Sequence, residues 1–257
     1  MDAVRNGRAE LSGEAAEHLR RVLRVQAGQQ FELSDNRSLY LAEVEEFRKG
    51  AVSFRILDRL EAENPALRLT LFASLIKFDR FEWIVEKATE LGVERIVPVV
   101  AERSEKGLGE AAIKRTERWR KIALESSQQS RRARVPEIGG SIRFPEAVAA
   151  QGDRRLFLEE ERGAAPILSA LPEPERRSSS DDVRLLVGPE GGWTEEERLA
   201  AAAGGWQPVS LGPLILRAET AAIAALAILV SAWSARAIQS DPWSHLHEGS
   251  SSAPPAR

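Results

Sequence analysis

Apolar and polar residues alternate along much of the first 60 positions of the chain. The alternation runs through residues 30–35, 39–47 and 51–60, with turn residues between the runs. A period of two is typical of strands with one buried face. A short helix is expected before these strands, over residues 13–25. Several short strands with one helix predict a small β-barrel.

After Asn64-Pro65 the pattern changes, because strand candidates begin to alternate with helical periods. Asp79 is expected to cap a helix, with Glu82 three residues later, and Gly92 is expected to end it. A further helix is predicted over residues 114–129. The strand candidates are residues 67–76, 96–100, 134–138, 154–159, 185–187 and 209–211. This order predicts an α/β fold, with a mostly parallel sheet covered by helices on both faces.

The two patterns divide the chain into a β domain over residues 1–63 and an α/β domain over residues 66–239, with a linker near residues 61–65. Residues 172–182 and 240–257 are rich in Pro and Ser. Such composition favours disorder, so we expect both stretches to be disordered and the second to form a C-terminal tail.

Composition narrows the possible chemistry. The chain has no cysteine, and its three histidines are His18, His245 and His247. Disulfides, thiolate metal sites and cysteine nucleophiles are thereby excluded, and we expect no metal. The net charge is −3, and the longest apolar stretch, near residues 221–230, is shorter than the roughly 20 residues that span a bilayer. We therefore expect a cytoplasmic protein with no membrane segment.

A glycine-rich turn over residues 188–192 carries the first candidate chemistry. It follows an apolar run and precedes a helix that Thr194 and Glu197 are expected to cap. Ligands of open α/β sheets bind beyond the carboxyl ends of strands, where glycine lets the backbone approach them. The turn lacks both phosphate-binding patterns, and Glu190 would repel a pyrophosphate. A cation such as S-adenosylmethionine fits better, whereas the alternative is an ordinary strand-to-helix turn.

A second segment, residues 211–221, joins an apolar loop to an alanine-rich helix. Glu219 suits the positive end of that helix dipole, so capping alone is one explanation for it. Arg217 is harder to explain structurally, because a buried guanidinium needs a partner.

Arginine also clusters in two places, around residues 18–24 and 131–134. Either cluster is a candidate for phosphate contact with RNA or, alternatively, a solvated face.

These segments, in this order, resemble the RsmE family of 16S ribosomal RNA uracil-N3 methyltransferases in the SPOUT superfamily. Residues 18–24, 87–93, 119–122 and 132–138 also fit, and the resemblance covers residues 11–234. It implies a PUA-like RNA-binding barrel followed by a SPOUT-type parallel sheet with a deep trefoil knot. It also implies a homodimer with the active site near its interface.

The resemblance implies S-adenosylmethionine as the cofactor and 16S rRNA or the small ribosomal subunit as the partner. The residues expected to bind the cofactor are Leu158, Gly188, Pro189, Gly191, Gly192, Leu211, Gly212 and Leu216. Those expected to contact RNA are Arg20, Arg21, Arg24 and Arg132.

Methylation at uracil N3 needs no covalent intermediate, which suits a chain without cysteine. Arg217 is expected to stabilise negative charge on the uracil carbonyls. Glu219 or Glu190 is expected to accept the proton or to hold Arg217, and the choice between them stays open.

Two other classes of protein also stay open. One is a non-catalytic RNA-binding protein that keeps the fold, because Arg131 and Leu214 depart from the family's usual residues, as does Ala218. The other is a nicotinamide-binding oxidoreductase, which the absence of a dinucleotide fingerprint disfavours.

Overall fold

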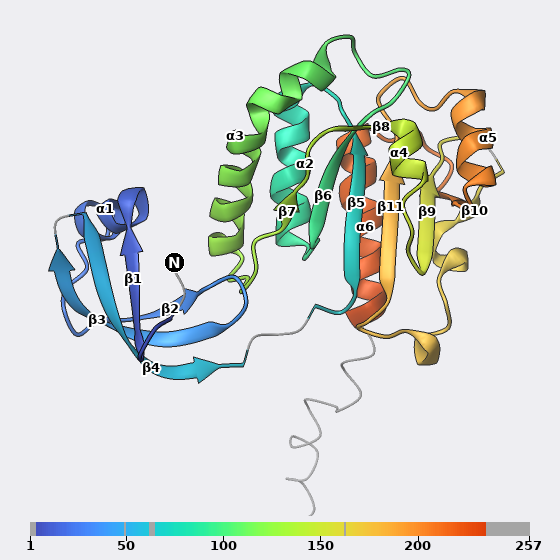
Figure 1. The fold of residues 1–257 in the computed structure, drawn as a ribbon. Helices are drawn as coiled ribbons and strands as arrows, with labels where there is room; N and C mark the ends of the chain where they lie inside the picture. The colour runs from blue at the N-terminus through green and yellow to red at the C-terminus, as the bar shows by residue number, and fades with distance from the viewer. Residues whose placement is uncertain (1–3, 49, 62–64, 162, 235–257) are drawn as a thin grey trace, which may run out of the picture.

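The computed structural model describes residues 4–48, 50–61, 65–161 and 163–234, in a small N-terminal β region and a larger α/β region (Figure 1). The expected tail at residues 240–257 lies outside the described residues, as do positions 62–64 of the expected linker.

The N-terminal region is a four-stranded antiparallel sheet in the order β1-β4-β3-β2 with one helix beside it. Its elements are β1 (Arg8–Ser12), α1 (Gly13–Arg21), β2 (Gln30–Ser34), β3 (Leu39–Arg48) and β4 (Ala51–Leu60). The three predicted strands are confirmed to within one residue at each end, whereas β1 was not predicted. Helix α1 is shorter than expected, because the chain has left the helix before Arg24, which adopts a left-handed φ of +50°.

The second region holds an eight-stranded sheet in which every pair is parallel. The order is β10-β12-β9-β11-β5-β6-β7, and β8 also pairs with β6. The strands are β5 (Arg68–Ser74), β6 (Arg95–Val100), β7 (Glu137–Ile138), β8 (Ile142–Arg143), β9 (Arg154–Leu158), β10 (Ala165–Pro166), β11 (Asp182–Val187) and β12 (Gln207–Ser210). The predicted strand at residues 134–138 is therefore confirmed only over its last two residues.

Helices cover both faces of this sheet, as predicted (Figure 1). They are α2 (Phe78–Glu90), α3 (Leu108–Gln129), α4 (Phe144–Val148), α5 (Glu195–Ala203) and α6 (Ala218–Ser234), with short 3-10 turns η1 (Ile167–Ala170) and η2 (Pro174–Arg176). Strand β5 alternates between the two faces. Leu71 packs with residues of α2, α3 and α6, and Phe72 packs with residues of α4 and α5. The trefoil knot stays a prediction.

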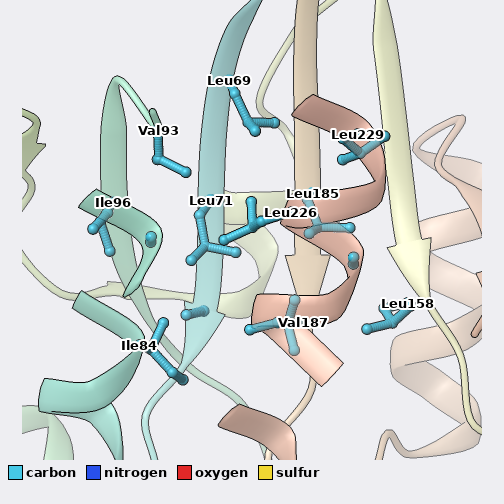
Figure 2. Close-up of a cluster of buried hydrophobic side chains, with 14 of the residues drawn as sticks. Leu69, Leu71, Ile84, Val93, Ile96, Leu158, Leu185, Val187, Leu226 and Leu229 are labelled. Atoms are coloured by element: carbon cyan, nitrogen blue, oxygen red, sulfur yellow. The ribbon is translucent and has the colours of Figure 1, made fainter. Parts of the chain in front are cut away.

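Helix α6 owes its position to apolar packing on the centre of the sheet. Leu226 and Leu229 of this helix lie against Leu71 of β5 and Leu185 of β11 (Figure 2), and all four are fully buried. Burying each such side chain contributes on the order of 2 kcal/mol. The packing fixes where α6 begins, close to the carboxyl ends of β9, β11 and β12.

The expected cap at Asp79 is wrong. Helix α2 begins at Phe78, its N-cap is Lys77, and no side-chain cap hydrogen bond forms there. Asp79 lies inside the first turn instead, where a carboxylate favours the positive end of the helix dipole. The predicted end is confirmed, since Gly92 follows the helix with a φ of +90°.

The expected disorder of residues 172–182 is also wrong. Arg177 donates from Nε to Pro172 O at 2.9 Å and from Nη1 to Ala232 O at 2.5 Å. Trp233 Nε1 donates to Asp181 Oδ2 at 2.8 Å. These contacts tie the segment to the end of α6, and β11 begins within it.

The two regions meet through the turn between β2 and β3. Asn36 Oδ1 accepts a hydrogen bond from Val135 N at 2.6 Å, and Ser34 Oγ donates to Ala133 O. Across the described ranges, no helix combines the length and apolar character needed to cross a membrane.

Candidate active site

A cavity of about 270 Å³ lies where three neighbouring strands, β12, β9 and β11, end at the same edge of the sheet. Its walls come from residues 158–160, 187–193 and 211–221. The structure brings together there all the expected cofactor-binding residues except Gly191, namely Leu158, Gly188, Pro189, Gly192, Leu211, Gly212 and Leu216. The parallel register explains this convergence, because parallel strands present their carboxyl ends on one side.

The turn after β11 requires glycine at two positions. Gly192 has a φ of +68°, and a Cβ there would clash with Glu160 Oε1. A Cβ at Gly188 would lie 2.9 Å from Trp193 Cε2. At these two positions the main chain forms the cavity wall.

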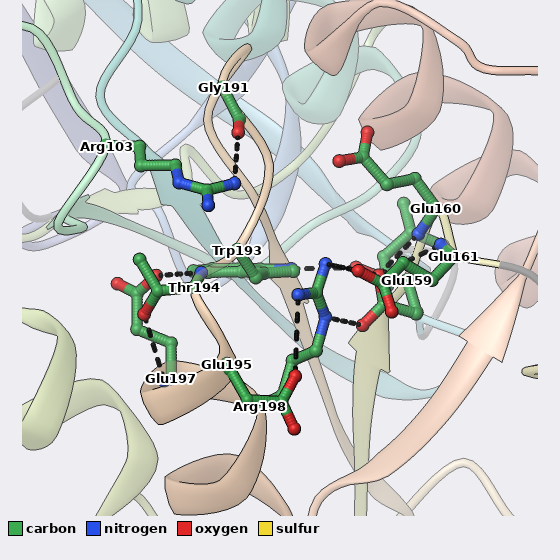
Figure 3. A network of polar contacts seen from close by, with 11 residues as sticks. Arg103, Glu159, Glu160, Glu161, Gly191, Trp193, Thr194, Glu195, Glu197 and Arg198 are labelled. Atoms are coloured by element: carbon green, nitrogen blue, oxygen red, sulfur yellow. Dashed lines mark hydrogen bonds and ion pairs between the residues drawn. The ribbon is translucent and has the colours of Figure 1, made fainter.

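Trp193 joins this turn to the end of β9. The side chain is buried, its Nε1 donates to Leu158 O at 2.9 Å, and its ring stacks on Phe157 with centroids 4.7 Å apart. The expected capping box follows directly, since Glu197 N donates to Thr194 Oγ1 and Thr194 N donates to Glu197 Oε2 (Figure 3).

The loop after β6 supports the same turn from outside. Arg103 Nη1 donates to Gly191 O at 2.9 Å (Figure 3), and Glu102 N donates to Glu197 Oε1 at 2.9 Å. Gly191 thus faces Arg103 and does not line the cavity, so its role in cofactor binding stays a prediction.

Glu159 at the cavity wall is held as a structural carboxylate. Arg198 Nε donates to its Oε2 at 2.8 Å, and the main-chain N–H groups of Glu160 and Glu161 donate to its Oε1 (Figure 3). Burial acts to raise the pKa of Glu159, but these hydrogen bonds outweigh it and hold the pKa below its ordinary value. The neighbouring Glu160 also lines the cavity and is exposed.

The expected catalytic residues occupy different positions at this site. Arg217 and Glu190 line the cavity, whereas Glu219 is buried beside it and does not. Arg217 is exposed, which contradicts the idea of a guanidinium enclosed by apolar side chains. Within the described residues Glu219 pairs with Arg80, and no ion pair joins it to Arg217.

Sequence reasoning missed Arg80. Its Nη1 pairs with Glu190 Oε1, and its Nε lies 3.9 Å from Glu219 Oε1. The one available signal was a basic residue four positions after the strand candidate at residues 67–76, at the edge where ligands bind. That signal is weak without knowledge of which strands pair.

The arginines expected to contact RNA have different surroundings. Arg20 and Arg21 remain exposed and share Glu17, whose Oε2 lies 2.7 Å from Arg21 Nε. Arg24, three residues after the end of α1, is also exposed. These three side chains are open to a partner.

Arg132, in contrast, is engaged by the protein itself. It donates from Nη1 to Thr89 O at 2.5 Å and from Nη2 to Val93 O at 3.0 Å. The guanidinium thus donates to main-chain carbonyls at and just beyond the end of α2. Burial of the Arg132 side chain lowers its pKa. We therefore leave Arg132 out of the RNA-contacting set proposed below.

Across the described part of the chain, no group of three or more His, Cys, Asp or Glu side chains is arranged to hold a metal ion.

Comparison with known proteins places this site in context. Residues 62–230 match the model of an RNA methyltransferase domain, and residues 11–57 match that of an RNA methyltransferase PUA domain. The chain is 30% identical over 212 residues to ribosomal RNA small subunit methyltransferase E of Aquifex aeolicus, covering 82% of this chain and 89% of that protein. It is 33% identical over 230 residues to the protein of that name from Bacillus subtilis, covering 85% and 88%.

A solved structure agrees with these matches. The structure of ribosomal RNA small subunit methyltransferase E from Neisseria gonorrhoeae, bound to S-adenosyl methionine, superposes with a TM-score of 0.80 at 31% identity. The match covers 91% of this chain and 96% of that one. The predicted fold class, a PUA-like region followed by a SPOUT-type α/β region, is confirmed.

Proposed function

Because this chain belongs to the RNA methyltransferase family, we propose that it methylates N3 of a uracil in 16S rRNA, using S-adenosylmethionine. The observation that carries the proposal is the cavity where three strand-end loops meet, with Arg217 and Glu190 on its wall. Related proteins are small-subunit rRNA methyltransferases by name, which supports the same substrate for this chain.

The cavity suits this cofactor on its own chemistry. The leucines at positions 158, 211 and 216 offer apolar surface to an adenine, and the carboxylates of Glu160 and Glu190 favour a cation. Because position 192 is a glycine, only its main chain lines the cavity there. Bound S-adenosylmethionine supplies the methyl group as an electrophile on its sulfonium.

Arg217 and a nearby carboxylate would assist removal of the proton from uracil N3. As the N3 proton leaves, negative charge spreads onto the uracil carbonyl oxygens, and the Arg217 guanidinium stabilises that charge more than it stabilises the neutral base. Glu190 lines the cavity and Glu219 does not, which favours Glu190 as the acceptor of the proton. Glu219 then has a structural role, through its ion pair with Arg80.

RNA would be held first by the N-terminal region. Arg20, Arg21 and Arg24 provide an exposed positive surface suited to phosphates. The target base would then turn out of its stack into the cavity, because its N3 is otherwise engaged in pairing. A ribosomal substrate also suits a cytoplasmic enzyme.

We further propose that the enzyme is a homodimer. Leu214 and Ile215, at the cavity wall, are 78% and 80% exposed, and α6 leaves Ala227 exposed on its outer side. A second copy covering these positions would bury apolar surface and complete the wall. Light scattering should give the mass of two chains, and Ile215→Asp should shift it toward one; a wild-type monomer at micromolar concentration contradicts the proposal.

A titration tests the function and separates it from both alternatives. The purified protein should bind S-adenosylmethionine but not NADH, and should transfer labelled methyl groups to small subunits that lack the modification. An RNA-binding protein without catalysis would retain the RNA and transfer no label. A nicotinamide enzyme would bind NADH.

A further inference from the structure

Arg80 lies outside every segment assigned above to cofactor or RNA, yet it contacts both candidate carboxylates. Helix α2 begins soon after β5 ends, so that Arg80 stands in its first turn. From there Nη1 reaches Glu190 and Nε lies 3.9 Å from Oε1 of Glu219. One guanidinium therefore joins α2, the turn after β11 and the start of α6.

The sheet explains how residues so distant in sequence meet. Strands β5 and β11 are parallel neighbours, with Val187 paired to Ala73. The segments that follow the two strands therefore leave the sheet side by side at the same edge. Helix α6 packs beside α2 and begins at that edge too. The parallel register therefore brings the three segments together.

Burial makes the contact between Arg80 and Glu219 more consequential than a surface ion pair. The Arg80 side chain is 30% exposed and that of Glu219 only 9%. Glu219 Oε2 is buried and has no hydrogen-bond partner among the described residues. Without Arg80, the Glu219 carboxylate would lose its nearby positive charge in a poorly solvated place.

We infer that Arg80 is a positioning residue for the methyl transfer, an inference that rests on the proposed function. It fixes Glu190 at the cavity wall and Glu219 at the start of α6, and through Glu219 it sets the position of Arg217, two residues earlier. A planar guanidinium can address two carboxylates with different edges, whereas a lysine ammonium is a single point charge.

A double-mutant cycle tests this role by single-turnover methylation at saturating cofactor and RNA. Arg80→Gln should lower the rate by about 10- to 100-fold while S-adenosylmethionine affinity stays within about threefold. In a Glu190→Gln, Glu219→Gln background the same change should cost less than about twofold, since residues acting as one unit are not additive. Arg80→Lys should restore only part of the rate.

The control is Arg118→Gln, which removes another arginine that pairs with α2, through Glu82, away from the cavity. It should leave the rate unchanged. An equal loss from Arg80→Gln in both backgrounds would overturn the inference, and so would a fall in cofactor affinity that matches the fall in rate.

Amide exchange gives a readout independent of activity. Arg80→Gln should speed exchange in the first turn of α6, including Ala221, whose N–H donates to Arg217 O at 2.8 Å. Arg118→Gln should not. Unchanged exchange overturns the positioning role whether or not the enzyme methylates uracil, whereas a wild-type protein that transfers no methyl group overturns the proposed function alone.

Discussion

Alanine at position 192 should separate the cofactor-binding role of the glycine turn from its contribution to stability. Gly192 has a φ of +68°, and a Cβ there would clash with Glu160 Oε1. Both residues line the cavity. The Glu160 carboxylate or the turn must therefore move, and either movement reshapes the surface proposed to hold the cofactor.

Two effects of Gly192→Ala can be told apart in size and origin. The left-handed backbone costs alanine about 1–2 kcal/mol of folding stability wherever it occurs. Gly13 has the same φ of +68° with no atom within 4 Å of its Cβ, so Gly13→Ala reports that backbone cost alone. The clash is specific to Gly192, and we expect it to weaken cofactor binding at least about tenfold, equivalent to about 1.4 kcal/mol.

Calorimetry with S-adenosylmethionine and urea unfolding measure the two effects on the same variants. Both alanine variants should lose similar stability, and only Gly192→Ala should lose affinity. In a Glu160→Ala background, which lacks the clashing carboxylate, Gly192→Ala should cost less affinity than it does in the wild type. A folded Gly192→Ala protein with wild-type affinity would refute the assignment of this turn to the cofactor.

Three further outcomes are expected. Arg217→Ala should lower the single-turnover rate about a hundred- to a thousandfold and leave cofactor affinity within a few fold; a wild-type rate would make Arg217 structural. Alanine at all three exposed arginines, Arg20, Arg21 and Arg24, should weaken RNA binding and reduce its salt slope by about 0.7–0.9 for each phosphate that is no longer neutralised, and an unchanged slope would exclude them. Because the folded-state pKa of Glu159 is lowered, its contribution to stability is present above its unfolded pKa of about 4.3 and is lost as pH falls through the lower folded value. Urea unfolding of Arg198→Ala should show a weaker dependence on pH in that acid range, and an unchanged dependence would contradict the assigned cause.

The glycine turn and its helix cap could be predicted because their signals are local. Glycine at 188 and 192, followed by Thr194 and Glu197 three apart, reports a strand end and a helix start within ten residues. Sheet order adds that the turn lies between the ends of β9 and β5.

The features that sequence reasoning missed depend on contacts between distant segments. Arg80 acquires a role only because β5 and β11 are neighbours in the sheet. Arg132 belongs to an arginine cluster in the sequence, but its guanidinium donates to the main-chain carbonyls of Thr89 and Val93. Residues 172–182 have the composition of a disordered stretch, but Arg177 binds the end of α6. No local pattern distinguishes these cases from solvated side chains.

The central claim is methyl transfer to uracil N3, and mapping the product tests it most directly. The enzyme should be incubated with labelled S-adenosylmethionine and small subunits that lack the modification, and the rRNA then analysed by mass spectrometry and primer extension. The account predicts one methyl group on a single uracil of 16S rRNA, with primer extension stopping there because N3 methylation blocks the pairing edge. Label on the ribose, on a ring carbon or on no nucleotide at all would contradict it.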